Sequence, residues 1–153
     1  MLEIHAQIDI EAPPSVVWGV LAEFGMYRRW NPLIRSVLGQ AVSGRQLEII
    51  LAAPPGADVA SRLTIVHLRE GHEMTWVEWW PVPGMFASER RFRIEPLAPG
   101  GVRFHHVEKV RGIMVPLLGG RRRARERAGF DAMNAALKLR AERACAQQAA
   151  ATP

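Results

Sequence analysis

The stretch RRRARERAGFDAMNAALKLRAERACAQQ, residues 121–148, decides the fold of this chain. Mainly apolar residues recur in it at helical spacing, with no proline between them: Phe130, Met133, Asn134, Leu137, Ala141, Ala144 and Cys145. Charged residues such as Asp131, Lys138 and Arg140 lie off this stripe. The spacing predicts one helix from residue 121 to about 148, roughly 40 Å long. An apolar stripe of that length has to be buried against another layer of the protein.

Most of the chain before this helix has the pattern of β-strands. From Leu2 to Ile10 apolar and polar residues alternate, which is typical of a half-buried antiparallel strand. Further strands are predicted, between breaks rich in proline and glycine, over residues 33–38, 47–51, 59–68, 74–80, 85–95 and 102–111. Two short helices are predicted after the first strand, one starting near Pro14 and one from Glu23 to Arg29. The predicted class is α+β, with a seven-stranded antiparallel curved sheet wrapped around the long C-terminal helix.

The composition fits one domain with one hydrophobic core. The chain has 153 residues, of which 48% are apolar, and we expect a domain over residues 1–148 followed by a frayed tail over 149–153. No apolar run is long enough to span a bilayer, no signal-peptide pattern is present, and Cys145 is the only cysteine. These features predict a cytoplasmic location. The net charge of +5, carried mostly by arginine, permits anionic partners without specifying one.

Several motifs occur in the order found in one known family. They are Val17-Trp18, Trp30-Asn31-Pro32-Leu33-Ile34, Phe104, His106 and Glu108 followed by Gly112, and Phe130-Asp131-Ala132-Met133-Asn134 with Leu137 and Lys138. With these motifs the chain resembles, over nearly its whole length, the START-like superfamily, also called SRPBCC or polyketide cyclase/dehydrase-like proteins. The resemblance implies a helix-grip fold with a deep, mostly apolar cavity between sheet and helix. The family includes lipid carriers and aromatase/cyclases, so fold alone does not give function.

The hairpin over residues 85–111 predicts a polar group inside this cavity. If its turn centres on Pro99, Ile94 faces Phe104, Phe92 faces His106 and Arg90 faces Glu108 on the concave face. One interpretation is a buried ion pair that satisfies itself, with His106 as a hydrogen-bonded core residue. The other is the polar end of a ligand cavity.

On the second interpretation the chain binds a small hydrophobic or amphipathic molecule, either lipid-like or polyketide-like. The candidate ligand-binding residues are Phe86, Arg90, Phe92, Phe104, His106, Glu108, Met133 and Leu137. The alternative function is a polyketide cyclase or dehydratase that uses His106 and Glu108 as acid and base. No nucleophile motif, phosphate-binding glycine loop or Cys/His metal set occurs, so we expect no cofactor and no metal, and we favour binding over catalysis. Because His105 and His106 are adjacent in a strand, they should point to opposite faces.

Three tryptophans in the strand over residues 74–80 cannot all face inward. Trp76 and Trp80 should share one face and Trp79 should take the other, so a loop or a second subunit of a homodimer should cover the exposed side. A base-stacking platform is disfavoured because the flanking charges, Glu73 and Glu78, are acidic.

The arginines at the start of the long helix oppose the helix macrodipole. The favoured interpretation of residues 121–127 is a solvated turn. The third hypothesis is a membrane- or partner-binding module in which Arg121, Arg122 and Arg123 make a weak contact with an anionic membrane. Nucleic acid is not an expected partner, because no nucleic-acid-binding motif is present.

Overall fold

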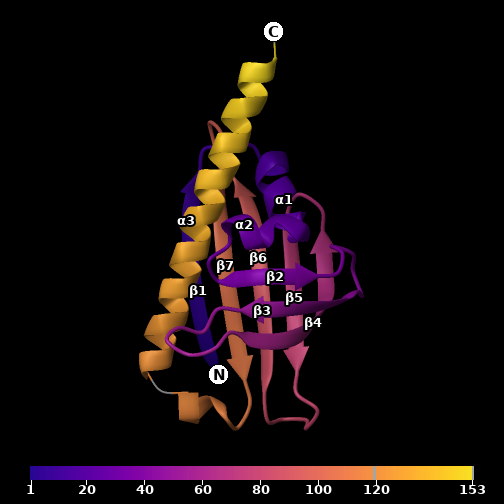
Figure 1. The fold of residues 1–153 in the computed structure, drawn as a ribbon, viewed down its shortest axis with the longest axis vertical. Coiled ribbons are helices and arrows are strands. Elements are labelled where there is room, and N and C mark those ends of the chain that lie inside the picture. Colours follow the sequence, from indigo (N-terminus) through magenta and orange to yellow (C-terminus); the bar gives the residue numbers. More distant parts are fainter. Residues whose placement is uncertain (119, 153) are drawn as a thin grey trace.

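A computed structural model describes residues 1–118 and 120–152, although nothing is described of the side chains of residues 118 and 120–122. The elements follow the predicted order (Figure 1). The strands are β1 (Leu2–Ile10), β2 (Ile34–Leu38), β3 (Gln46–Leu51), β4 (Val59–Arg69), β5 (Glu73–Trp79), β6 (Ala87–Pro96) and β7 (Val102–Arg111). The helices are α1 (Pro14–Ala22), the 3₁₀ turn η1 (Phe24–Met26), α2 (Tyr27–Trp30), the 3₁₀ turn η2 (Val115–Leu118) and α3 (Gly120–Ala151).

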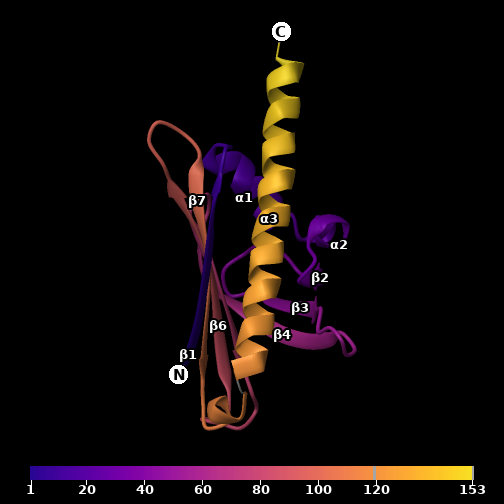
Figure 2. The ribbon, with the colours of Figure 1, turned by 90° about the vertical axis from the view of Figure 1, so that its left-hand side faces the viewer.

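The seven strands form one antiparallel sheet in the order β1-β7-β6-β5-β4-β3-β2. The sheet curls, so that β2, β3 and β4 lie on the other side of α3 from β1, β6 and β7 (Figure 2). This arrangement is the predicted curved sheet wrapped around one long helix. It leaves the inner face of the sheet and the apolar stripe of α3 facing each other.

The stripe that predicted α3 is the face that the helix buries. Met133, Leu137 and Ala141 are fully buried, and Phe130 is 1% exposed. The helix continues to Ala151, so residues 149–151 of the expected frayed tail are helical. No helix in the described part of the chain is both long and apolar enough to cross a bilayer.

The second predicted short helix is divided into η1 and α2. The side chain of Asn31 ends α2, since its Oδ1 accepts hydrogen bonds from the backbone N–H groups of Leu33 (3.0 Å) and Ile34 (2.8 Å). Trp30 is half-buried against the core, with its ring 5.1 Å from that of Tyr27. This turn directs the chain into β2.

The tryptophans of the β5 region are placed differently from the prediction in one respect. Trp76 is fully buried and Trp79 is 61% exposed, as opposite faces of one strand require. Trp80 was expected to share the face of Trp76, but it is 45% exposed and lies against Phe86. The reason is that β5 ends at Trp79, so the alternation of the strand no longer applies to Trp80.

Candidate functional site

The pairing of β6 with β7 builds the candidate site. Ile94 pairs with Phe104, Phe92 with His106 and Arg90 with Glu108, which is the register predicted from a turn at Pro99. On its other side β6 pairs with β5, which places Trp76 beside Arg90. One row of the inner face of the sheet therefore holds an indole, a guanidinium and a carboxylate next to one another.

Arg90 and Glu108 form a buried ion pair. Nη2 of Arg90 donates to Oε2 of Glu108 at 3.2 Å, and Oγ of Ser88 donates to Oε1 at 2.5 Å. Arg90 is 7% exposed and Glu108 is 8% exposed. Both carboxylate oxygens therefore have a donor, as a buried charge requires.

His106 lies beneath α3 and is fully buried. Its ring stacks on Phe130, with centroids 3.8 Å apart, and its Nδ1 lies 3.3 Å from Oδ1 of Asn134. An amide oxygen only accepts, so Nδ1 carries the proton and Nε2 presents a lone pair. Burial first, and then the positive charge of Arg90, hold the pKa of His106 well below its ordinary value, although the hydrogen bond to Asn134 opposes this shift. The imidazole is therefore neutral at pH 7.

This lowered pKa makes folding stability depend on pH. As the pH falls below about 6.5, the unfolded chain binds a proton at His106 before the folded protein does, so stability is lost on acidification. We expect His106 to lower the free energy of unfolding by roughly 1 kcal/mol between about pH 7.5 and about pH 5.5. Urea titrations at both pH values measure the decrease. His5, whose pKa is also lowered, adds a decrease of the same sign, so the comparison is with His106→Gln. An equal decrease in that variant would contradict the assignment.

Five buried polar atoms at this site have no hydrogen-bond partner in the described part of the chain. They are Nε and Nη1 of Arg90, Nε1 of Trp76, Nδ2 of Asn134 and Nε2 of His106. Four are donors, and the His106 nitrogen is an acceptor. A buried polar group without a partner is costly, and the large majority of buried side-chain polar atoms in proteins are hydrogen-bonded. Most of the unpartnered buried side-chain atoms in the described part of the chain therefore belong to this site, while Trp30, Asn31 and Ser61 carry others elsewhere.

Apolar side chains surround the polar group. Phe92 lies 5.1 Å from Trp76 and stacks on Phe104 at 6.1 Å between ring centroids, while Met133 and Leu137 cover the same region from α3. Seven of the eight candidate residues thus lie in the core between the sheet and α3. Phe86 does not join them, since it is half-buried beyond the end of the sheet and lies against Trp80.

The predicted site residues did not include Ser88, Asn134, Phe130 or Trp76. For two of these four residues, the amino-acid sequence contained a feature that could have identified them. Asn134 is the one amide in an apolar helical stripe, and Ser88 shares the inner face of its strand with Arg90.

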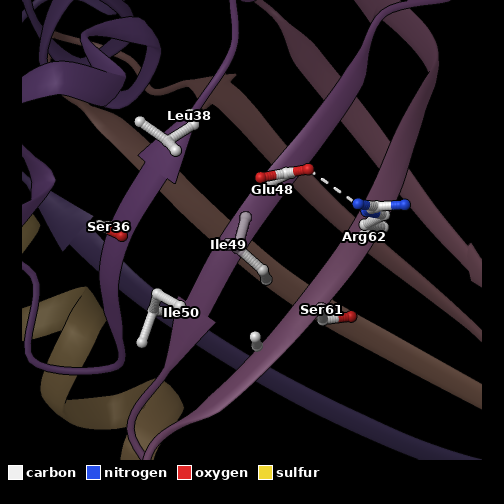
Figure 3. Close-up of a pocket in the computed structure, with 8 residues that line it drawn as sticks. Ser36, Leu38, Glu48, Ile49, Ile50, Ser61 and Arg62 are labelled. Carbon is white, nitrogen blue, oxygen red and sulfur yellow. Dashed lines mark ion pairs between the residues drawn. The ribbon is translucent and has the colours of Figure 1, made fainter.

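The site is closed in this structure. Phe92, Phe104, His106, Met133 and Leu137 are all fully covered by neighbouring atoms. Two hollows of the described structure lie elsewhere, at the surface. One, of about 300 Å³, lies over β2, β3 and β4 beside Leu38 and the Arg62–Glu48 ion pair (Figure 3). Neither of these two hollows is lined by a candidate residue. Because the five side chains named above are fully covered, a ligand would have to displace packed side chains to reach them.

The second hollow, of about 240 Å³, lies on the outer face of β1, β6 and β7. His105 faces it, as expected for the neighbour of an inward His106. Its Nε2 donates to Glu95 at 2.6 Å, and its Nδ1 lies 3.2 Å from Nε2 of His5. The described residues contain no cluster of three or more His, Cys, Asp or Glu side chains suited to a metal ion.

Comparisons with known proteins agree with this architecture. The family model described as "Polyketide cyclase / dehydrase and lipid transport" matches residues 1–143. No curated protein matches the sequence.

Solved structures share the fold at low sequence identity. A START superfamily protein from Mycobacterium smegmatis is 17% identical over 92% of this chain and 97% of its own, with a TM-score of 0.72. A protein from Thermus thermophilus is 16% identical over 99% of this chain and 100% of its own, with a TM-score of 0.73. The di-domain ARO/CYC StfQ of the steffimycin biosynthetic pathway is 15% identical over 97% of this chain and 51% of its own, with a TM-score of 0.65. At these identities the likeness concerns the fold.

Proposed function

The chain belongs to the polyketide cyclase/dehydrase and lipid transport family, and from this premise we propose that it binds a small amphipathic molecule between the sheet and α3. The apolar part of the ligand would lie among Phe92, Phe104, Met133 and Leu137. Its polar group would meet Arg90, His106 and Asn134. The fold is typical of proteins that bind small hydrophobic molecules.

The observation that carries the proposal is the set of unpartnered polar atoms at Arg90, Trp76, His106 and Asn134. An ion pair that served only to satisfy itself would leave no reason for a neighbouring amide, indole and imidazole each to lack a partner. A ligand hydroxyl that accepts a hydrogen bond from Arg90 or Asn134 and donates one to Nε2 of His106 would satisfy both kinds of group.

Charge balance indicates which oxygen fits. Glu108 already neutralises Arg90, so a ligand carboxylate would bring a second negative charge into the same buried region. A phenol or an alcohol brings none, and its hydroxyl can both accept a hydrogen bond and donate one. We therefore favour a neutral oxygen group on an apolar skeleton, which is closer to a polyketide than to an ionised fatty acid.

Phe130 is the side chain that has to move for a ligand to enter. It covers His106 and lies 5.4 Å from the guanidinium carbon of Arg90. It packs with Ile4 and Ala6 in a small cluster separate from the main core. Moving it would expose the polar group without disrupting the rest of the core.

The same histidine bears on the alternative of a cyclase or dehydratase. Nε2 of His106 has a free lone pair, which a general base needs. Its lowered pKa makes it a weak base at neutral pH, because an effective base has a pKa near the working pH. Binding is therefore the better supported function.

Calorimetric titration with 2-naphthol and 2-naphthoate tests the proposal, because the two probes share a ring system and differ in charge. We expect 2-naphthol to bind at least about tenfold more tightly. Asn134→Leu, which removes one donor from the helix side, should weaken 2-naphthol binding, whereas Asn31→Leu, outside the site, should not. Tighter binding of the carboxylate, or binding of neither probe, would contradict the proposal.

A further inference from the structure

Two uncharged segments adjoin the end of the molecule at which α3 begins. No charged residue occurs from Trp79, the last residue of β5, to Ser88 in β6, or from Gly112, after β7, to Gly120, the first residue of α3. The loop between β5 and β6, and the chain from the end of β7 to η2, lie at the bottom of Figure 1. Exposed apolar patches larger than a few hundred Å², roughly, mark interaction sites in proteins, so the side chains that these segments expose are of interest.

The two segments contact each other directly. The backbone N–H of Ile113 donates to the carbonyl of Gly84 at 3.1 Å, and that of Met114 donates to the carbonyl of Met85 at 3.4 Å. Gly112, with φ +128°, allows this approach, because a Cβ there would clash with the backbone oxygen of Met85. The segments therefore form one surface.

That surface exposes large apolar side chains. We name it the loop patch, and its members are Trp79 (61% exposed), Trp80 (45%), Val82 (54%), Ile113 (73%) and Leu117 (74%). Two of the five are tryptophans, the side chain that is enriched where proteins meet the headgroup layer of a bilayer.

Exposed arginines occur next to the loop patch in the chain. Arg111 lies in the same cross-strand row as Trp79, since both pair with Ala87 of β6. Arg123 and Arg125 are exposed in the first turns of α3. Residues 111–127 contain six arginines and one acidic residue, Glu126, which has an interaction partner, and Arg127 is ion-paired with Asp131 at 3.2 Å. Arg121 and Arg122, expected as membrane contacts, lie outside the described side chains.

We propose that the loop patch docks on the surface of an anionic phospholipid bilayer. Tryptophan and aliphatic side chains would enter the headgroup region, while the arginines would attract the phosphates. A protein partner would contact the same apolar residues, but the exposed charges of Arg111, Arg123 and Arg125 favour a surface of dense negative charge. This inference is independent of the proposed ligand, because bilayer binding needs no opening of the core.

Co-sedimentation with lipid vesicles tests the proposal on the full chain. Vesicles with about one third phosphatidylglycerol should bind the protein, pure phosphatidylcholine should bind it at least about tenfold less, and raising the salt from about 0.1 M to about 0.5 M should release it. Trp79→Ser/Trp80→Ser and Arg123→Glu/Arg125→Glu should each weaken binding about tenfold or more.

Matched variants of exposed residues elsewhere test whether any loss of vesicle binding is specific to the loop patch and its arginines. Leu38→Ser/Val59→Ser removes equally exposed apolar side chains from the sheet, and Arg28→Glu/Arg29→Glu makes the same charge change on α2. Both should bind vesicles like the wild type. Circular dichroism confirms that each variant is folded. Binding without dependence on anionic lipid, equal loss in the control variants, or a dimer abolished by Trp79→Ser/Trp80→Ser would overturn the proposal.

Discussion

Replacement of Glu108 with leucine is expected to lower the free energy of unfolding by about 3–5 kcal/mol. The change leaves the guanidinium of Arg90 buried at 7% exposure without its counter-charge. It also removes the acceptor of the Ser88 hydroxyl. Water cannot replace these interactions without entry into the packed core. Urea unfolding followed by circular dichroism measures the loss.

The double variant Arg90→Met/Glu108→Leu distinguishes the effect of the two charges on stability from the effect of the volume that the two side chains fill. Because both charges are removed together, we expect it to be more stable than Glu108→Leu alone, and the two effects should be clearly non-additive. A double variant as unstable as the sum of the two single variants would show that the residues act independently, against the pairing described here.

Trp76→Ala is the second large effect, with an expected loss of about 3–5 kcal/mol. Trp76 is fully buried, and its ring lies 5.6 Å from Phe24 and 5.1 Å from Phe92. Truncation leaves a cavity that the rigid sheet can fill only in part.

Trp79→Ala is the matched control for that change. It removes the same side chain three residues away, at 61% exposure, and should change stability by less than about 0.5 kcal/mol. Equal losses in the two variants, again measured by urea unfolding, would contradict the assignment of the buried face of β5.

Much of the fold was predictable because its periodicities are strong. The apolar stripe of α3 and the alternation in β1 each predict which face of the element is buried. These two apolar faces can be buried together if the sheet packs around the helix. The Arg90–Glu108 pairing followed from the turn at Pro99, since the register of a hairpin is fixed once its turn is fixed.

The missed features depend on distances between elements. Nothing in the sequence places Asn134 over His106, because that contact depends on how α3 is rotated against β7. Trp80 was misplaced because a strand end is set by local backbone geometry, here just before Pro81. The closure of the site by Phe130 is a packing result, and packing density cannot be read from a pattern of apolar residues.

The most direct measurement for the binding function is a crystal structure of the protein soaked with 6-bromo-2-naphthol, whose bromine locates the ring by anomalous scattering. The proposal predicts the ring between the sheet and α3, Phe130 displaced, and the hydroxyl oxygen about 2.7–3.2 Å from atoms of Arg90, His106 or Asn134. If the bromine lies only in the surface hollow beside Leu38, or if ordered water alone satisfies the polar atoms of a closed core, the binding function is wrong.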